Sequence, residues 1–245
     1  MFINQEAPHS SLKPLNFVLW FILAFQAGTI NVGGFLTCQR FVTHVTGFAT
    51  HFGVDLASGY YIEALSMIMV PSFFLLGCMT SAFLIDRRKF IRKQGLYTET
   101  FLFSAGAFFV ICILGVAGKL GSFGAISHSS SNFILLSTLS FLSGLQNSMI
   151  GLASGLLVRT THLTGITTDL GVGLMRMLYP NVDHHQRRTE FKMNLLRFGT
   201  ILSFIFGSIF GGLAFLKFQY WGFLIPTIIS SVLAHFSWQH HRGKT

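Results

Sequence analysis

Long apolar stretches alternate with short polar ones along this chain. Each apolar stretch holds 17 to 26 residues, which is the length range of a helix that crosses a hydrocarbon core of about 30 Å. The pattern predicts an all-α integral membrane protein with six transmembrane helices. Polar tails are expected over 1–14 and 237–245, and a polar loop over 179–193. The six predicted spans are 15–36, 61–85, 98–117, 133–158, 195–216 and 220–236.

One polar segment of the chain occurs twice. THVTG at 43–47 returns as THLTG at 161–165, and the match continues downstream at a constant separation of 118 residues. A shorter match precedes each copy, since the Gly and Asn of AGTIN at 27–31 recur in SGLQN at 143–147. The repetition indicates a duplicated membrane protein.

The repeat divides the chain into two related halves. The halves are 15–117 and 132–236, and a Gly- and Ser-rich linker over 118–131 joins them. In each half a polar, glycine-containing segment follows the first apolar stretch. We call these segments the first block, residues 43–57, and the second block, which starts at Thr161.

Composition supports the membrane assignment. Hydrophobic residues make up 51% of the chain and charged residues only 10%, and the mean hydropathy is +0.59. A soluble domain usually carries about 25% charged residues. The formal charge of +9 lies between the apolar stretches and not along an amphipathic face, which argues against a nucleic-acid partner. Three cysteines without close spacing predict neither disulfides nor a metal site.

The distribution of Lys and Arg predicts the topology. If the blocks do not cross the membrane, 14 of the 17 basic residues lie on the side of the basic loop at 86–93. If both blocks cross, the division is eight to nine. Cytoplasmic loops collect Lys and Arg, so the first arrangement is favoured, with both termini cytoplasmic. The opposite side then holds Arg40, Lys119 and Lys217.

This topology inverts one half relative to the other. Three spans separate Thr43 from Thr161, so the two blocks enter from opposite faces as re-entrant segments. Lipid permits such a segment only where its backbone is buried in protein or lines a wet cavity. Two re-entrant segments that meet near the midplane are a common arrangement of transporter sites.

The blocks carry side chains suited to an anion or a proton. Thr46 and Thr164 are suitable N-caps for helices that follow, and free amides at a helix N-terminus attract anionic groups. His44 and His162 can titrate near neutral pH. An acid within a membrane, such as Asp169, is a functional candidate by default.

The expected site is not symmetric, because Asp169 aligns with His51, and Asp55 with Gly173. Gln26 and Asn31 lie inside the first span, where a polar group either bridges to a neighbouring helix or lines a polar pathway. The candidate substrate-binding residues are Asn31, Thr43, His44, Thr46, Gly47, Asn147, Thr161, His162, Thr164, Gly165, Thr168 and Asp169.

The sequence thus predicts a small-solute transporter that rocks its halves about a midplane site. The alternative is a membrane scaffold or partner-binding protein in which the blocks are packing devices. An enzyme is disfavoured because no complete set of nucleophile and base is recognisable. No metal site or cofactor is expected. The expected partners are the lipid bilayer and an unidentified small molecule or ion, with no nucleic acid and with homo-oligomerisation left open.

Several of these residues also resemble the YoaK family of bacterial membrane proteins. The resemblance rests on AGxxN with HVTG at 44–47, and on SGLQN followed by TTHLTGxTTDLG at 160–171. It extends over about 15–236 and implies a bacterial inner-membrane protein of about six spans, in a domain-of-unknown-function group without an established activity. Two residues depart from the family pattern, Asn31 where Asp is typical and Phe48 where Asn commonly follows Thr-Gly.

Overall fold

The computed structural model describes residues 14–91, 94–124, 130–155, 160–180 and 183–242. Within these ranges the chain is helical and contains no strand, which confirms the all-α prediction. A π-helix, η1 (Ala82–Asp86), continues α4 into α5, and a 3₁₀-helix, η2 (Gln219–Phe223), joins α9 to α10. The helices are α2 (Pro14–Cys38), α3 (Val45–Ala57), α4 (Tyr61–Ser81), α5 (Arg87–Phe90), α6 (Tyr97–Val116), α7 (Ser130–Ser154), α8 (Leu163–Leu178), α9 (His184–Phe218) and α10 (Leu224–Arg242).

Five stretches of the described chain are long and apolar enough to cross a membrane. The last of them contains both α9 and α10. The helices of the blocks, α3 with 13 residues and α8 with 16, are not among them. Large apolar side chains on α4, α6, α9 and α10 are exposed, as expected for lipid contact. The five stretches are 17–38, 67–86, 97–116, 133–154 and 184–239.

The predicted loop over 179–193 is wrong for most of its length. Helix α9 already begins at His184, because the carboxylate of Asp183 caps it by accepting a 2.7 Å hydrogen bond from the backbone N–H of Gln186. A polar, exposed helix has no apolar period that would distinguish it from a loop. Helix α10 likewise runs to Arg242, through part of the predicted tail.

Other boundaries agree more closely or lie outside the described residues. Helix α7 ends at Ser154, where Gly155 has a φ of +66°, earlier than the predicted end at 158. Residues 156–159 are outside the described ranges, as are 1–13 of the predicted N-terminal tail, 92–93 of the basic loop, 125–129 of the linker and 243–245 of the C-terminal tail.

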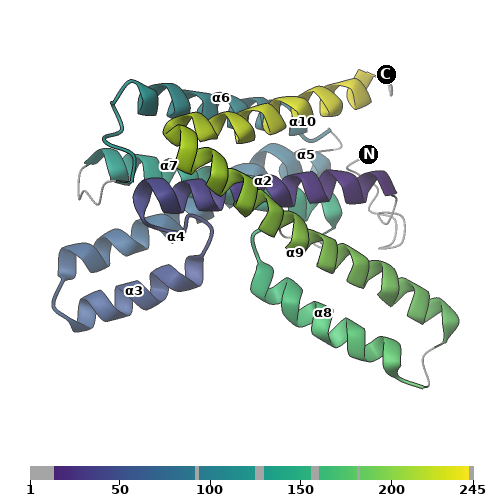
Figure 1. Cartoon of the computed structure of the whole chain (residues 1–245). Coiled ribbons are helices and arrows are strands. Elements are labelled where there is room, and N and C mark those ends of the chain that lie inside the picture. The colour runs from purple at the N-terminus through teal and green to yellow at the C-terminus, as the bar shows by residue number, and fades with distance from the viewer. Residues whose placement is uncertain (1–13, 92–93, 125–129, 156–159, 181–182, 243–245) are drawn as a thin grey trace.

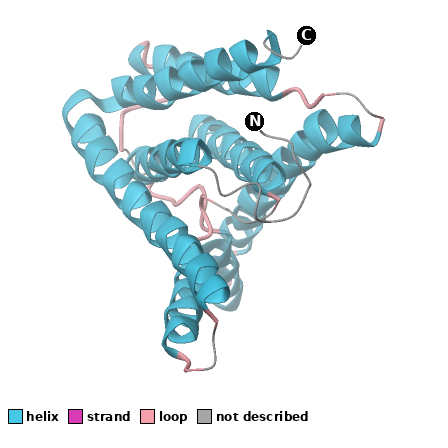
Figure 2. Ribbon diagram, turned by 90° about the vertical axis from the view of Figure 1, so that its right-hand side faces the viewer, coloured by secondary structure: helices cyan, strands magenta, loops and turns pink. Residues whose placement is uncertain are grey.

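The central helices are α2 and α7, the first helix of each half. They are 61% and 67% buried over their candidate spans, against 22% for α4. Each packs along a helix of the other half, α2 along α9 and α7 along α4, while α6 packs on α10 (Figure 1). Figure 2, viewed from the end at which α2 begins and α10 ends, shows the long helices running in different directions and outlining a triangle.

The two central contacts use one sequence pattern, Phe-x-x-Gly. It occurs in α2 (Phe25 to Gly28), α4 (Phe74 to Gly77), α7 (Phe141 to Gly144) and α9 (Phe204 to Gly207). In both helix pairs the glycine of each helix faces the carbonyl of the phenylalanine in its partner, so that a Cβ at any of the four glycines would collide with backbone. Small residues that let helix backbones approach are a principal source of helix association in membranes.

The blocks extend from this centre in opposite directions. α3 packs on α4 and α8 packs on α9, so that each forms a hairpin with the helix that follows it. In Figure 1 the α3–α4 hairpin lies at the left and the α8–α9 hairpin at the lower right. The first residues of α3 and α8 lie nearer the centre, and their last residues lie at opposite ends of the molecule.

The close crossings predict a position-specific cost of added volume. Gly207→Ala forces the α2 and α9 backbones apart and is expected to lower the unfolding free energy by about 1–3 kcal/mol. Gly106 of α6 also follows Phe-x-x, but a Cβ there meets open space. Gly106→Ala should therefore leave stability unchanged or raise it, because alanine favours helix. Thermal unfolding in detergent compares the two variants, and equal melting temperatures would contradict the role of the crossings.

Candidate functional site

Each block carries a histidine at the boundary of its helix. His44 precedes α3 with φ −102° and ψ 74°, and His162 precedes α8 with φ −97° and ψ 56°, so the two halves share this backbone geometry. Neither residue forms a side-chain capping bond. The rings fold over Gly47 and Gly165, where an added Cβ would come within 2.9 Å of the histidine Nδ1. An added Cβ at either glycine would therefore force the histidine ring to move.

The prediction that Thr46 and Thr164 are N-caps is wrong. The helices begin one residue before each threonine, at Val45 and Leu163, so both threonines lie within the first turn. Their carbonyls accept hydrogen bonds from the hydroxyls of Thr50 and Thr168 one turn later, at 3.3 and 3.0 Å. Because no side chain caps the helices, their first amides remain available to another acceptor.

An asparagine of the central helix contacts the start of the block in each half. The Thr43 hydroxyl donates to Oδ1 of Asn31 at 2.8 Å. The backbone N–H of Thr161 donates to Oδ1 of Asn147 at 3.4 Å. The structure therefore brings together asparagine, threonine, histidine and glycine within each half.

The two groups lie on separate hairpins. α3 and α8 do not pack along each other, contrary to the expectation that the two blocks meet in a shared midplane site. His44, Thr46, His162, Thr164, Thr168 and Asp169 are exposed, while Asn31, Thr43, Gly47, Asn147, Thr161 and Gly165 are half-buried. Within this chain, then, the block histidines and Asp169 are not packed dry against neighbouring helices.

A cavity of about 410 Å³ opens at the first block. Gln39, with φ 55°, ends α2 and turns the chain back, which places Arg40 beside the start of α3. Phe35 and Phe41 stack at a centroid distance of 4.6 Å and form an aromatic wall. The cavity is lined by Phe35, Gln39, Arg40, Phe41, His44, Gly47, Phe48, Thr50 and His51.

Arg40 and His51 are site residues that the sequence analysis did not select. In the sequence, Arg40 contributes only to the predicted topology, and His51 is noted only because it aligns with Asp169. The signal was present, because His51 lies seven residues after His44 and therefore on the same face of a helix. The position of Arg40 depends on the sharp turn at Gln39, which no sequence period announces.

The second half differs in its polar contacts. Gly173 of α8, the counterpart of Asp55, packs directly on Asn194 and Arg197 of α9. Arg197 donates to Asn194 Oδ1 at 2.7 Å and pairs with Glu190 at 3.5 Å. Glu190 also pairs with Arg176 of α8, at 3.3 Å. These bonds fasten the second block to α9.

Other polar groups in the spans join helices. Gln26 donates to the Ser230 hydroxyl at 2.6 Å and to the carbonyl of Pro226, linking α2 to α10. Gln146 donates to the carbonyl of Leu23 at 3.1 Å, linking α7 to α2. Of the two interpretations left open, the bridging role applies to Gln26. Across the described residues, no three or more His, Cys, Asp or Glu side chains group closely enough to hold a metal ion.

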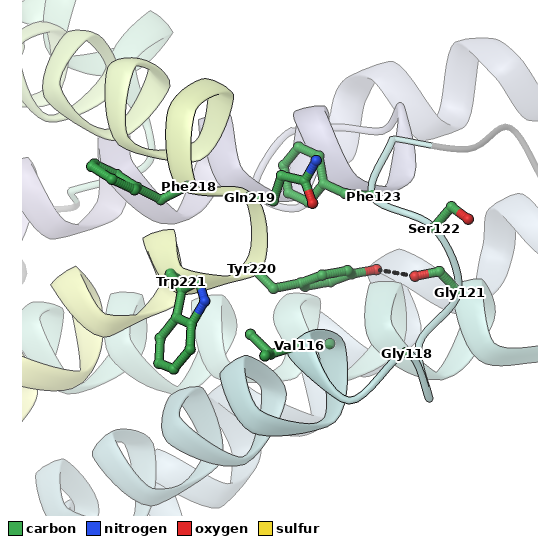
Figure 3. A pocket seen from close by; sticks show the side chains of 10 residues that line it. Val116, Gly118, Gly121, Ser122, Phe123, Phe218, Gln219, Tyr220 and Trp221 are labelled. Carbon is green, nitrogen blue, oxygen red and sulfur yellow. Dashed lines mark hydrogen bonds between the residues drawn. The ribbon is translucent and has the colours of Figure 1, made fainter.

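A second cavity, of about 530 Å³, lies where η2 meets the connection after α6. Gln219, with φ 50°, forms the elbow between α9 and α10. Figure 3 shows Tyr220 reaching across to Gly121, whose carbonyl accepts from the phenol at 3.3 Å, with Phe218 and Trp221 on the opposite side. The hydroxyl of Tyr220 is thus bonded to the connection after α6 and holds the elbow against it. The described residues that line this second cavity include no charged side chain.

The asparagine contacts predict unequal effects of one substitution in the two halves. Thr43→Val removes the hydroxyl that donates a hydrogen bond to Asn31, and is expected to lower the unfolding free energy by about 0.5–1.5 kcal/mol. Thr161→Val keeps the backbone N–H that donates to Asn147, so it should lower the unfolding free energy by less. Unfolding in detergent measures both variants. A loss for Thr161→Val as large as that for Thr43→Val would show that the two bonds do not differ in this way.

Comparison with known proteins identifies a family. The sequence profile described as "Protein of unknown function (DUF1275)" matches residues 19–236, nearly the whole helical region. Searches of curated proteins and of solved structures gave no significant match. The resemblance to YoaK proteins is consistent with this profile. Because the match covers far more than half of its length, the chain belongs to the DUF1275 family of proteins of unknown function.

Proposed function

We propose that this protein is a small-solute transporter of the bacterial inner membrane, with solute-contacting groups on each of the two blocks. The observation that carries the proposal is the repeated arrangement of asparagine, threonine, histidine and glycine, held on hairpins that extend toward opposite ends of the molecule. If the blocks served only to pack helices together, an exposed histidine at the start of each block helix would have no role. Inverted repeats around a central site are the architecture of many secondary transporters.

The proposed topology has six spans in two inverted halves. α9 and α10 are separate helices joined by η2, so the long helices α2, α4, α6, α7, α9 and α10 supply six crossings. The start of α2 and the end of α10 lie on one side of the molecule, toward which the basic helix α5 also lies (Figure 1). Basic residues mark the cytoplasmic side, which supports two cytoplasmic termini.

The packing supports two bodies that can rock. One body consists of α2, α9 and α8, and the other of α7, α4 and α3, each joined internally by glycine crossings and a hairpin. The Asn31–Thr43 bond links α2 of the first body to the segment that enters α3 of the second body. The Asn147–Thr161 bond links α7 of the second body to the segment that enters α8 of the first body. Rocking would stretch one of these two bonds while it relaxes the other, which suits alternating access.

The exposure of His44, His162 and Asp169 supports access by a solute more than a packing role. A second candidate, a partner-binding membrane protein, is favoured by a different observation. Both block helices also expose apolar side chains, including Val54 and Leu56 of α3 and Leu174 of α8, each more than 40% accessible. A docked protein would cover these residues together with the polar ones.

Transport is tested by flux in proteoliposomes. The probes are radiolabelled carboxylates, amino acids, sugars and nucleosides, with an internal dye that reports proton movement. His44→Ala and His162→Ala should each reduce flux of the transported solute at least tenfold, because each removes a side chain of the site. Thermal unfolding should change little, since both side chains are exposed.

His184→Ala is the matched control, because His184 is an exposed histidine at the start of α9, at the other end of the α8–α9 hairpin from His162. It should transport as the wild type does. If no solute of the panel moves, and His162→Ala changes only the melting temperature, the transport proposal fails. Co-purification of a protein partner that is lost when Val54 and Leu174 are changed to Asn would then favour the second candidate.

A further inference from the structure

We propose that the cavity at the first block binds the carboxylate of a small organic acid with an apolar body. The inference rests on the proposed function, because it names the substrate class of that transporter. It adds Arg40 and His51 to the site. The charge, the helix geometry and the wall of the cavity each point to this ligand class.

The charge of the cavity is positive. Arg40, His44 and His51 line it, and none of its described lining residues is acidic. Arg40 is half-buried, and within the described chain its guanidinium has neither an acidic partner nor a hydrogen bond. A partly desolvated guanidinium without a partner is costly, and a carboxylate satisfies it with two parallel hydrogen bonds. By contrast Lys119 and Lys217, the other basic residues of that proposed side, are exposed.

The start of α3 adjoins the same space through His44 and Gly47, although Val45 and Thr46 are not among the lining residues. His44 precedes the helix without a side-chain cap, so the amides of Val45 and Thr46 have no side-chain acceptor. These amides carry the positive end of the helix dipole. His44 and Gly47 line the cavity at this end, and the 13-residue helix is long enough for the dipole to count. The helix therefore adds to the attraction that Arg40 exerts on an anion.

Part of the cavity wall is apolar. Phe35 and Phe41 are stacked with an interplanar angle of 14°, and Phe48 is a buried residue behind the block. A hydrated anion such as inorganic phosphate gains nothing from this wall, whereas an apolar body buries surface against it. At about 410 Å³ the cavity falls within the usual size range of small-molecule sites.

The second block lacks this chemistry. Asp169 stands where the first block has His51, and its carboxylate would repel an anion. The cavity beside Tyr220 has aromatic rings but no charged side chain among its described lining residues. An acid is therefore expected to bind at the first block alone.

Calorimetry on the full chain in detergent tests the inference. The probes are benzoate, hexanoate, benzamide as the neutral match of benzoate, and inorganic phosphate. At least one of the two acids should bind saturably with one site per chain. Benzamide and phosphate should bind at least tenfold more weakly, because the first lacks the charge and the second lacks the apolar body. Arg40→Gln should weaken the acid at least tenfold, and Lys119→Gln should leave it unchanged.

Four outcomes would overturn the inference: neither acid binds, benzamide binds as tightly as the better acid, phosphate binds as tightly as the better acid, or Arg40→Gln binds that acid as the wild type does. If Arg40→Gln does not fold, Arg40→Lys replaces it. Lysine keeps the charge but loses the bidentate geometry, so it should weaken binding measurably, and wild-type affinity would overturn the inference.

Binding and flux separate this inference from the proposed function. Arg40-dependent binding of an acid that proteoliposomes do not transport would leave the ligand site standing and remove the transporter. Flux of another solute without binding of either acid would leave the transporter standing and remove the substrate class.

Discussion

Close backbone contact between helices is the interaction on which this structure depends. Lipid supplies no hydrophobic force between helices, so association relies on packing and on hydrogen bonds. Four glycines provide the packing, and each lies against a phenylalanine carbonyl of its partner helix. The polar bonds of Gln26 and Gln146 add interhelical links around the same centre. Both central contacts cross between the halves, so neither half can form them alone.

That exchange of helices determines where the blocks lie. Each block follows the first helix of its own half in the chain, but packs on a helix bound to the first helix of the other half. The asparagine contacts at the starts of the blocks therefore lie on the boundary between two packed bodies. A site on such a boundary changes whenever the bodies move, whereas a site inside one body would move rigidly with it.

The sequence predicted the positions of the helices better than it predicted which helices pack together. Apolar length predicted the central helices, and the repeat placed Asn31, Thr43, Asn147 and Thr161 among the candidate site residues, but the contacts between them are found only in the structure. Helix pairing was not accessible, because Phe-x-x-Gly also occurs at Phe103 to Gly106, where a Cβ meets open space. The start of α9 was missed since its first turns are polar. Arg40 was missed because its place depends on the backbone conformation of Gln39.

The two hairpins also differ in how firmly they are closed. In the second, Gly173 packs on a hydrogen-bonded group in which Glu190 and Arg197 are about one-fifth exposed. Charged hydrogen bonds in such a partly buried setting have directional geometry and resist sliding. Counting from the equivalent glycines Gly77 and Gly207, the counterparts of Asn194 and Arg197 in α4 are the buried apolar residues Ala64 and Met67. At these two positions, therefore, the first hairpin closes on α4 through non-directional apolar contacts, whereas the second closes on α9 through directional charged ones.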